Sequence, residues 1–303
     1  MPQADVHYPA TTPPNQTEPG FRKCLEFGDW LAREPIAVGN WSTVFRAAPR
    51  TSPTTGTYVI KVLHPHLEND PFAVSLFRTE ARVGQSVSHR HVVPILSEHV
   101  DERPFYLVMP FLSGKTLDFK VTRGVALSVV ESLWIIRQAA EALEALWLAG
   151  WMHGDVKPSN LMISAAGHVT LLDLGFARRL KEPHNGNGRR WVAGTINYLA
   201  PEWIMGTQPP DIRGDIYSLG VIFYQLLTGK RPYCVQSPAD LLRVHREIRI
   251  PSPRTWAPWI GREISRLVTS MLAADPLRRP QNPAELRERL IRFEIEHLAE
   301  QLN

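Results

Sequence analysis

The fold is decided by the stretch His153-Gly154-Asp155-Val156-Lys157-Pro158-Ser159-Asn160, which Asp173-Leu174-Gly175 follows at a short interval. Asp155 can accept the proton of an attacking hydroxyl, and Lys157 can neutralise charge on a terminal phosphate. Asn160 and the aspartate of the second stretch offer the hard oxygen ligands that Mg²⁺ prefers. Scattered Asp and Asn residues also form ordinary turns, but this set contains what the transfer of a phosphoryl group from ATP requires.

The composition is that of an ordinary globular protein. Of the 303 residues, 44% are hydrophobic and 21% charged, enough for a large core or for two lobes that share a cleft. The formal net charge is +4 without a dense Lys/Arg block, so nucleic acid is not an expected partner. Cys24 and Cys234 are far apart and lack zinc spacing, which indicates a reducing cytoplasm. The sequence shows no leader pattern and no apolar run of membrane-spanning length, so we expect a soluble chain without a membrane span.

The chain begins with a segment that has little to bury. Residues 1–24 are rich in Pro and Thr and poor in aliphatic side chains, and we expect a flexible tail. Apolar residues first cluster at Leu25-Glu26-Phe27-Gly28-Asp29-Trp30. A second run follows at Ile36-Ala37-Val38-Gly39-Asn40-Trp41-Ser42-Thr43-Val44-Phe45. Two strands around a tight turn fit this pattern, and alone it would be no more than a plain hairpin.

A lysine interrupts the next predicted strand. Tyr58-Val59-Ile60-Lys61-Val62-Leu63 is rich in β-branched and aromatic residues. A lysine inside such a strand needs an acidic partner. The candidates in the sequence are Glu68, Glu98 and Glu80, the last within a helix predicted over residues 71–87. The alternative is that the lysine and Glu80 are solvated surface charges.

Two His-x-His pairs stand near these elements. They are His64-x-His66 and His89-x-His91. Neither has Cys or carboxylate residues in ligand spacing, so we expect turn and surface roles rather than a metal site.

Together these motifs resemble the protein kinase family. The stretch His153–Asn160 stands where the family has H-R-D-x-K-x-x-N, and Asp173-Leu174-Gly175 stands where it has D-F-G. Gly194-Thr195-Ile196-Asn197-Tyr198-Leu199-Ala200-Pro201-Glu202 matches G-T-x-x-Y-x-A-P-E. Lys61 matches the V-A-I-K lysine, which pairs with the α- and β-phosphates and a helix glutamate. The family's usual distance implies that this glutamate is Glu80, and makes Glu68 and Glu98 poorer candidates. The resemblance covers roughly residues 28–290, which leaves no room for a second domain.

The resemblance implies an α+β protein of two lobes. After the tail, residues 25–303 would form one kinase domain. Its small lobe, about residues 25–109, would hold a β-sheet and one helix. A hinge at residues 110–114 would lead into a larger, mostly helical lobe at about residues 115–303.

Three features of the large lobe are structural on this interpretation. Apolar residues at helical spacing predict a helix from about Ser128 to Trp147 that leads into the catalytic loop. Glu202 would pair with Arg279, and Asp215 at the start of a central helix would brace the backbone of the catalytic loop.

The resemblance also implies a nucleotide site. The loop over the phosphates, G-x-G-x-x-G-x-V in the family, here reads Ala37-x-Gly39-x-x-Ser42-x-Val44, so only the middle glycine is kept. Ala and Ser are the smallest replacements that still allow the backbone close to phosphate oxygens. Pro110 has no N–H, but the backbone beyond it can pair with adenine. The implied nucleotide-binding residues are Ala37, Val38, Gly39, Asn40, Ser42, Val44, Val59, Lys61, Met109, Phe111, Leu112, Met162 and Leu172. The apolar ones among them could equally be ordinary core.

The implied reaction uses ATP and Mg²⁺. The implied catalytic residues are Asp155, Lys157, Lys61 and Glu80, and the implied metal ligands are Asn160 and Asp173. A lysine two residues after the base, in D-x-K-P-x-N, is typical of serine/threonine kinases. We therefore expect transfer to Ser or Thr of a protein substrate in signalling, by a chain similar to bacterial eukaryotic-like kinases.

The segment after Asp173-Leu174-Gly175 suggests how such a kinase would be regulated. In many kinases a phosphate on this activation loop binds the arginine before the catalytic aspartate. That arginine is replaced by Gly154, which would make this a non-RD kinase. Residues 176–194 contain no Ser, Thr or Tyr. We expect activity that does not depend on phosphorylation of the activation loop.

Two other functions are left open. The altered glycine loop, Gly154 and Leu174 would also fit a pseudokinase that acts as a nucleotide-binding scaffold. A pure interaction module that binds no nucleotide would not need the polar cleft residues. A thermal shift with and without Mg·ATP separates that module from the other two, because a ligand bound only by the folded state raises its stability.

Overall fold

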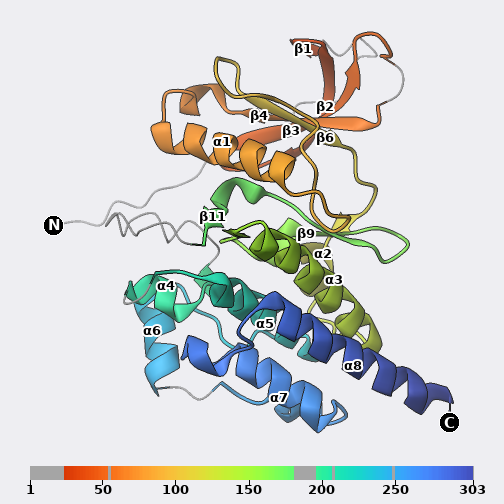
Figure 1. The fold of residues 1–303 in the computed structure, drawn as a ribbon, viewed down its shortest axis with the longest axis vertical. Coiled ribbons are helices and arrows are strands. Elements are labelled where there is room, and N and C mark those ends of the chain that lie inside the picture. The colour runs from red at the N-terminus through yellow and green to blue at the C-terminus, as the bar shows by residue number, and fades with distance from the viewer. Residues whose placement is uncertain (1–23, 54–55, 181–195, 207–208, 248–249, 303) are drawn as a thin grey trace.

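The computed structural model describes residues 24–53, 56–180, 196–206, 209–247 and 250–302. In Figure 1 a small part built around a β-sheet lies above a larger part built mainly of helices. The predicted α+β fold of two lobes is confirmed. Except for Cys24, the tail predicted at residues 1–24 lies outside the described residues.

The small lobe is built on a six-stranded antiparallel sheet with the order β1-β2-β3-β4-β6-β5. The strands are β1 (Leu25–Phe27), β2 (Trp30–Val38), β3 (Ser42–Pro49), β4 (Tyr58–Leu63), β5 (Ser97–His99) and β6 (Tyr106–Pro110). The predicted hairpin is present as β2 and β3. Its turn is closed by the N–H of Gly39, which donates to the carbonyl oxygen of Ser42 at 2.9 Å.

The register of the sheet decides which side chains face the cleft. Val44 lies opposite Lys61, and Val59 lies opposite Met109. Directly opposed residues of an antiparallel pair share one face, and residues two apart on a strand do so as well. These four side chains therefore lie on the same face. The other face has its own apolar cluster, made by Ala32, Ala47, Ile60, Val62, Tyr106 and Val108.

Helix α1 (Pro71–Ser86) packs against this lobe and ends within one residue of the prediction. The carboxylate of Asp70 caps it by accepting the N–H of Phe72 at 2.8 Å, and Pro71 suits the first turn. Its buried face includes Phe77 and Glu80. The helix also contacts the 3₁₀ turn η3 (Leu174–Phe176), so it links the sheet to the segment after Asp173.

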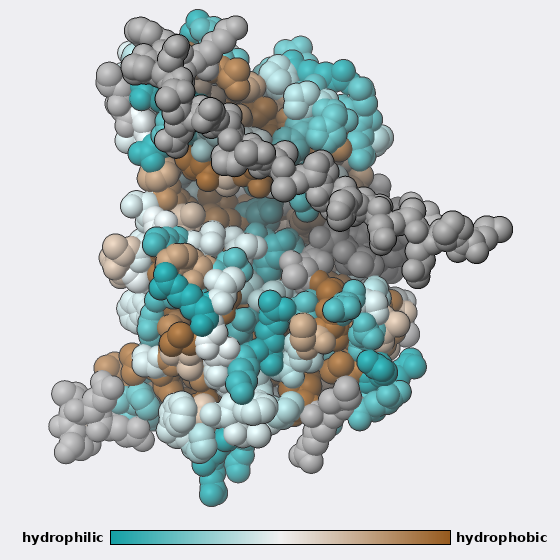
Figure 2. Space-filling model, turned by 180° about the vertical axis from the view of Figure 1, so that it is seen from behind, coloured by the Kyte–Doolittle hydropathy of each residue, from teal (hydrophilic) through white to brown (hydrophobic). Residues whose placement is uncertain are grey.

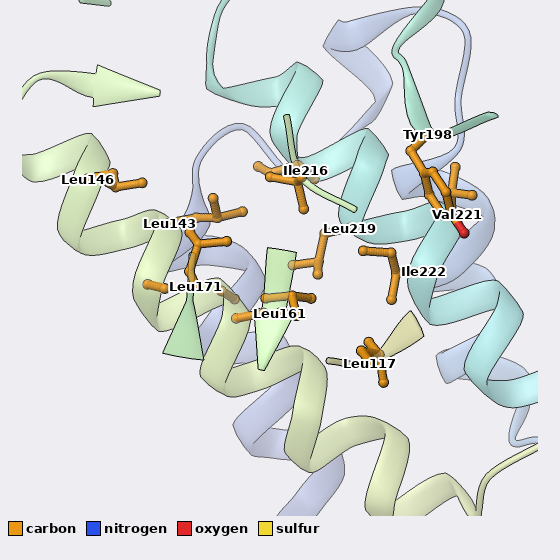
Figure 3. Close-up of a cluster of buried hydrophobic side chains, with 14 of the residues drawn as sticks. Leu117, Leu143, Leu146, Leu161, Leu171, Tyr198, Ile216, Leu219, Val221 and Ile222 are labelled. Atoms are coloured by element: carbon orange, nitrogen blue, oxygen red, sulfur yellow. The ribbon is translucent and has the colours of Figure 1, made fainter. Parts of the chain in front are cut away.

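The large lobe is mainly helical in the described residues. Its helices are α2 (Asp118–Val121), α3 (Val129–Leu148), α4 (Pro201–Met205), α5 (Ile212–Thr228), α6 (Pro238–Glu247), α7 (Arg262–Met271) and α8 (Pro283–Leu302). The hydroxyl of Ser128 caps α3 by accepting the N–H of Glu131 at 3.1 Å, and α3 matches the helix predicted from about Ser128 to Trp147. Figure 3 shows the core between α3, α5 and the strands that flank the catalytic loop. The side chains that meet there include Leu143, Leu146, Leu161, Leu171, Ile216, Leu219 and Ile222.

Short strands hold the loops of the large lobe in place. They are β7 (Lys115–Thr116), β8 (Trp151–Met152), β9 (Leu161–Ile163), β10 (Val169–Leu171) and β11 (Arg178–Arg179). β7, β9 and β10 form one sheet, and β8 pairs with β11. The catalytic loop runs from β8 to β9 through the 3₁₀ turn η2 (Pro158–Asn160). Both of its ends are therefore fixed by backbone pairing.

The surface role expected for both histidine pairs is wrong for His91. Its ring is buried and donates from Nδ1 to the carbonyl oxygen of Val169 at 2.7 Å, while Nε2 lies 3.2 Å from Glu141. His66 is exposed as expected. In the part of the chain that the structure describes, no group of three or more His, Cys, Asp or Glu residues is arranged to hold a metal ion.

None of the helices within the described ranges is both long enough and apolar enough to span a membrane.

Candidate active site

Lys61 lies between two carboxylates from different parts of the chain. Its Nζ is 2.6 Å from Oε2 of Glu80 on α1 and 3.0 Å from Oδ1 of Asp173. The partner expected from the sequence, Glu80, is thus in contact with the lysine. The Glu80 side chain is 3% exposed and that of Asp173 is 36% exposed. Lys61 is therefore anchored on the buried side, and Asp173 presents its carboxylate to the cleft.

Burial and charge act in opposite directions in this cluster, and at Glu80 burial outweighs Lys61 and raises the pKa to about 7. Burial alone would lower the pKa of Lys61, but the negative charges of Asp173 and Glu80 outweigh burial and raise it. Burial would likewise raise the pKa of Asp173, but attraction to Lys61 outweighs burial and lowers it. At neutral pH the cleft therefore holds a charged ammonium beside an ionised aspartate.

Asp173 has an uncommon backbone conformation. Its φ of 60° is the one positive value at a non-glycine residue in the described chain, and this left-handed region costs an L-residue roughly 1–2 kcal/mol. Directly afterwards η3 packs against α1, and a Cβ on Gly175 would lie 3.4 Å from the carbonyl oxygen of Leu76. Strain of this kind is typical of functional sites. Here it is maintained by the contacts of the segment that follows.

The catalytic loop brings its own polar side chains together. The buried carboxylate of Asp155 is 2.7 Å from Nζ of Lys157. Nδ2 of Asn160 donates to the backbone carbonyl of Asp155 at 2.9 Å and to its Oδ2 at 3.1 Å. Burial raises the pKa of Asp155 to about 6, although Lys157 opposes the rise. The group is poised between proton acceptance and proton release near neutral pH.

Asp215, on α5, holds the backbone of this loop in place. Oδ2 of Asp215 accepts the N–H of His153 at 2.6 Å, and Oδ1 accepts the N–H of Gly154 at 2.9 Å. The expected bracing contact of Asp215 is thus present. Burial lowers the pKa of His153, so its ring is neutral. Nε2 donates to the carbonyl of Leu172 at 3.0 Å and Nδ1 accepts the N–H of Asp155 at 3.2 Å, which ties Asp155 to the strand that leads to Asp173.

Gly154 occupies a position that favours glycine. Its φ is +79°, and a Cβ there would lie 2.6 Å from the carbonyl oxygen of Phe176. The first residue after His153 therefore has little room for a side chain while Phe176 stays in place.

The residues predicted for the nucleotide lie on two sides of one cleft. Val44, Val59 and Met109 share the inner face of the sheet with Lys61. Met162 and Leu172, both half-buried, come from the β9–β10 region of the other lobe. Figure 2 shows the surface hollowed between the lobes, with apolar residues along much of the hollow.

The segment that connects the lobes has one backbone donor already in use. The N–H of Phe111 donates to the carbonyl of Thr57 at 2.8 Å. Phe111 and Leu112 are half-buried against the main core. Of these two N–H groups, only that of Leu112 is then available as the candidate adenine donor. The loop over the phosphates is exposed at Ala37, Val38, Gly39 and Asn40, whereas Ser42 is buried at the start of β3.

Sequence reasoning missed Arg46. Its guanidinium carbon lies 3.5 Å from the centre of the Phe111 ring, and it pairs in register with Val59. Arg46 thus packs over the connecting segment from the cleft face of the sheet. The two-residue period of β3 could have found it, because Arg46 follows Val44 by two positions.

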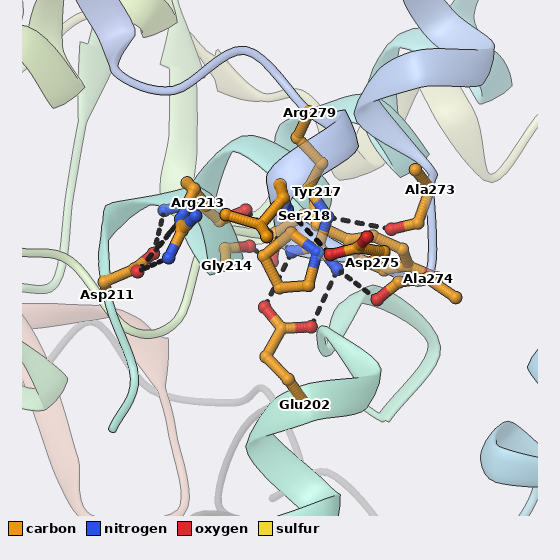
Figure 4. A network of polar contacts seen from close by, with 12 residues as sticks. Glu202, Asp211, Arg213, Gly214, Tyr217, Ser218, Ala273, Ala274, Asp275 and Arg279 are labelled. Carbon is orange, nitrogen blue, oxygen red and sulfur yellow. Dashed lines mark hydrogen bonds and ion pairs between the residues drawn. The ribbon is translucent and has the colours of Figure 1, made fainter. Parts of the chain in front are cut away.

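A buried ion pair joins α4 to the segment that follows α7. Arg279 forms two parallel bonds with Glu202, of 2.6 and 2.7 Å. Figure 4 shows its remaining N–H groups directed at backbone carbonyls. Those carbonyls belong to Arg213, Ala273 and Ala274. The expected partner of Glu202 is therefore in contact with it.

The polar residues fit Mg²⁺ shared with a phosphate. Asp173 is ionised and open to the cleft, and the buried Asn160 adds an amide on the same side of the loop. Mg²⁺ is usually held by one or two carboxylates together with substrate phosphates, rather than by an all-protein cage.

Comparison with known proteins identifies the class. The model of the protein kinase domain matches residues 31–290. The chain therefore belongs to the protein kinase family, as the resemblance of its motifs predicted.

Three similar proteins come from bacteria. The chain is 35% identical over 239 residues to serine/threonine-protein kinase PknB of Mycolicibacterium smegmatis, covering 77% of this chain and 38% of that protein. It is 35% identical over 240 residues to PknB of Mycobacterium tuberculosis, with the same coverage of 77% and 38%. It is 30% identical over 258 residues to the probable serine/threonine-protein kinase pknA2 of Bifidobacterium longum, covering 84% of this chain and 34% of that protein. The chain thus spans less than two fifths of the length of these relatives and resembles the bacterial serine/threonine type.

Proposed function

We propose that this chain transfers the γ-phosphoryl group of ATP, in the presence of Mg²⁺, to Ser or Thr of a protein substrate. The observation that carries the proposal is the contact of Lys61 with both Glu80 and Asp173, across the cleft from the ordered trio of Asp155, Lys157 and Asn160. The relatives named as serine/threonine kinases support the choice of acceptor.

Each residue has a role in this reaction. Asp155 accepts the proton of the acceptor hydroxyl, and Lys157 offsets negative charge beside it. Lys61, held by Glu80, orients the α- and β-phosphates. Asp173 and Asn160 would hold Mg²⁺, and the bound ion would neutralise charge on the phosphate oxygens.

The remaining cleft residues bind and position the nucleotide. Val44 and Val59 from the sheet, and Met162 and Leu172 from the other lobe, enclose an apolar slot for adenine. Met109 closes its inner end, and the N–H of Leu112 pairs with the base. The phosphate loop from Ala37 to Ser42 covers the phosphates with backbone rather than long side chains.

We also propose the boundaries of the two lobes and the cellular compartment of the protein. The small lobe at residues 25–109, the connecting segment at 110–114 and the large lobe at 115–303 are supported by the change from sheet to helices near Pro110. Cys24 and Cys234 are exposed and free of disulfides, which fits a reducing compartment such as the cytoplasm.

We further infer that the cleft is assembled without a phosphate on the activation loop. Two observations support this. Residues 176–194 contain no Ser, Thr or Tyr that could carry the phosphate, and Gly154 leaves little room for a phosphate-binding side chain before Asp155. The loop segment at residues 181–195 lies outside the described residues.

The proposal is tested by phosphate transfer from radiolabelled ATP to peptides that differ only in a Ser, Thr, Tyr or Ala acceptor. We expect the wild-type protein to label the Ser and Thr peptides. The Asp173→Ala variant should label no peptide, because it loses a metal ligand rather than a packing group. Folded wild-type protein that binds Mg·ATP, shown by a thermal shift, but labels no peptide and not itself would instead indicate a pseudokinase scaffold.

A further inference from the structure

Five cations gather on the large lobe next to the catalytic loop. We call them the basic surface, and they are Lys115, Lys120, Arg123, Lys230 and Arg231. None of them contacts the catalytic carboxylates in the interactions described above. Their position therefore needs an explanation separate from the phosphate chemistry.

The first group surrounds an exposed ring. Nζ of Lys115 lies 3.9 Å and the guanidinium carbon of Arg123 lies 4.1 Å from the centre of the Phe119 ring. That ring is 40% exposed. Contact with an aromatic ring holds a long cationic side chain against the surface while its charge stays in water. Both cations are thus partly ordered before any partner arrives.

The second group is continuous with the first. A Cβ on Gly229 would lie 2.5 Å from the carbonyl oxygen of Gly124, so the chain after Arg123 touches the chain before Lys230. Nζ of Lys230 lies 3.8 Å from the centre of the half-exposed Trp256 ring. Arg231 bonds to the hydroxyl of Tyr198.

The basic surface adjoins the loop that carries the catalytic base. β7, which contains Lys115, pairs with β9, and the N–H of Leu117 donates to the carbonyl of Leu161 at 2.7 Å. Leu161 directly follows Asn160. Helix α2 contacts the turn Pro158–Asn160. A peptide with its hydroxyl at Asp155 would therefore run past these cations.

The local charge is positive. Within residues 115–131 and 229–231 the acidic residues are Asp118 and Glu131. Glu131 is paired with Lys120, and Asp118 lies near Tyr198, the contact of Arg231. Lys115, Arg123 and Lys230 contact aromatic rings rather than carboxylates in the interactions above.

We propose that the basic surface binds acidic side chains that flank the acceptor Ser or Thr, so that the preferred substrate is an acidic segment of a protein. This inference rests on the proposed function, and it names the substrate class of the same site. The phosphates of the nucleotide are assigned to Lys61 on the other lobe, so these cations are left for the second substrate. Opposite charge across such a surface raises affinity and speeds encounter.

The test uses Thr peptides with four Glu, four Gln, four Lys or four phosphoserine residues around the acceptor, placed before it in one series and after it in another. In at least one series the Glu peptide should exceed the Gln peptide in kcat/KM by about tenfold, since each exposed ion pair adds a small factor. The gain should lie in KM and shrink in high salt.

Variants then assign the preference to the surface. Lys115→Glu with Arg123→Glu should reduce the Glu-to-Gln ratio to one or below. The matched control is Arg262→Glu with Arg266→Glu on α7, which makes the same change in net charge at exposed positions and should keep the ratio. Thermal unfolding shows whether each variant is folded, and Lys230→Glu gives a second, independent single variant.

Binding is measured separately from catalysis. Fluorescence anisotropy of a labelled Glu peptide on the Asp155→Asn protein should show tighter binding than the Gln peptide, with the same response to the variants. If no peptide is phosphorylated, the proposed function fails while this binding still decides the inference. Equal use and equal binding of Glu and Gln peptides would overturn it. The inference would also fail if the control variant lost the Glu-to-Gln preference equally, or if the surface variant raised the KM for ATP instead of the KM for the peptide. A clear preference for phosphoserine over Glu peptides would overturn it as well.

Discussion

Asp155 combines deep burial with a cationic neighbour. Burial raises the pKa of this carboxyl to about 6, and the ion pair with Lys157 limits the rise. A base with a pKa near the working pH is efficient, because it is mostly ionised and still holds a proton well. The protonated form cannot accept a proton from the acceptor hydroxyl, so activity should depend on pH.

We predict that kcat/KM is constant above about pH 7 and falls as the pH drops through about 6, where Asp155 in the free enzyme gains its proton. Lys157→Ala removes the opposing charge, so the pKa of Asp155 should rise and activity should be lost at a higher pH. The measurement is a profile of kcat/KM for a peptide over roughly pH 5 to 8, recorded for both proteins. Protonation of ATP itself would inflect both profiles at the same pH. An inflection that stays in place in the Lys157→Ala variant would assign the titration to another group.

Single residues were predictable where a motif supplies their partners. Lys61 lies in β4 and Glu80 lies in α1, and their contact was expected from the resemblance to the protein kinase family. Arg46 and the buried His91 were missed or misjudged, because their partners Phe111 and Glu141 become neighbours only through the fold. In the sequence, Gly154 is seen only as a replacement of the family's arginine. The structure adds that this position has a positive φ and that the carbonyl of Phe176 leaves little room for a Cβ.

At the scale of elements, the β2–β3 hairpin shows what replaces two glycines. Ala37 pairs in register with Val44, and Ser42 is buried at the start of β3. The turn still closes through Gly39 and Ser42. Neither Ala37 nor Ser42 has a positive φ, so their side chains cause no backbone strain in this conformation.

We therefore predict that Ala37→Gly with Ser42→Gly lowers the KM for ATP only modestly, about twofold, by easing the approach of the backbone to phosphate oxygens. Steady-state kinetics with varied ATP measures this change, and Ala47→Gly in the same strand controls for added backbone freedom. A change from no activity to substantial activity would favour the pseudokinase interpretation.

Long elements were predictable and short ones were not. α1 and α3 have caps, helical spacing and sufficient length, and both end close to the expected residues. Strands β7, β8 and β11 have two residues each. No period can be read from two residues, so their pairing depends on the tertiary structure around the catalytic loop.

At the scale of the whole molecule, the Glu202–Arg279 pair ties α4 to the segment after α7. Arg279 is 3% exposed and directs its N–H groups to two carboxylate oxygens and three carbonyls. Removal of one partner leaves a buried charge without compensation.

Arg279→Ala should therefore lower the free energy of unfolding by about 3–5 kcal/mol. Urea unfolding measures the loss. The neighbouring Arg278 is exposed, so Arg278→Ala should change stability by no more than about 0.5 kcal/mol. Similar losses in both variants would show that the buried pair has no special role.

The central claim is that the unmodified chain has an assembled and active phosphoryl-transfer site. The Lys61–Glu80 contact links α1 to the sheet, and Asp215 fixes the catalytic loop. Neither contact uses a Ser, Thr or Tyr side chain. The sequence of the activation loop agrees with this claim, because residues 176–194 contain no Ser, Thr or Tyr that could be phosphorylated.

The most direct measurement is a time course of phosphate transfer by phosphatase-treated protein, from the first mixing with Mg·ATP and a Thr peptide. The account predicts the full initial rate without a lag, and the same rate after preincubation with Mg·ATP. A lag that preincubation removes, with phosphate mapped between Asp173 and Glu202, or no transfer at all, would contradict it.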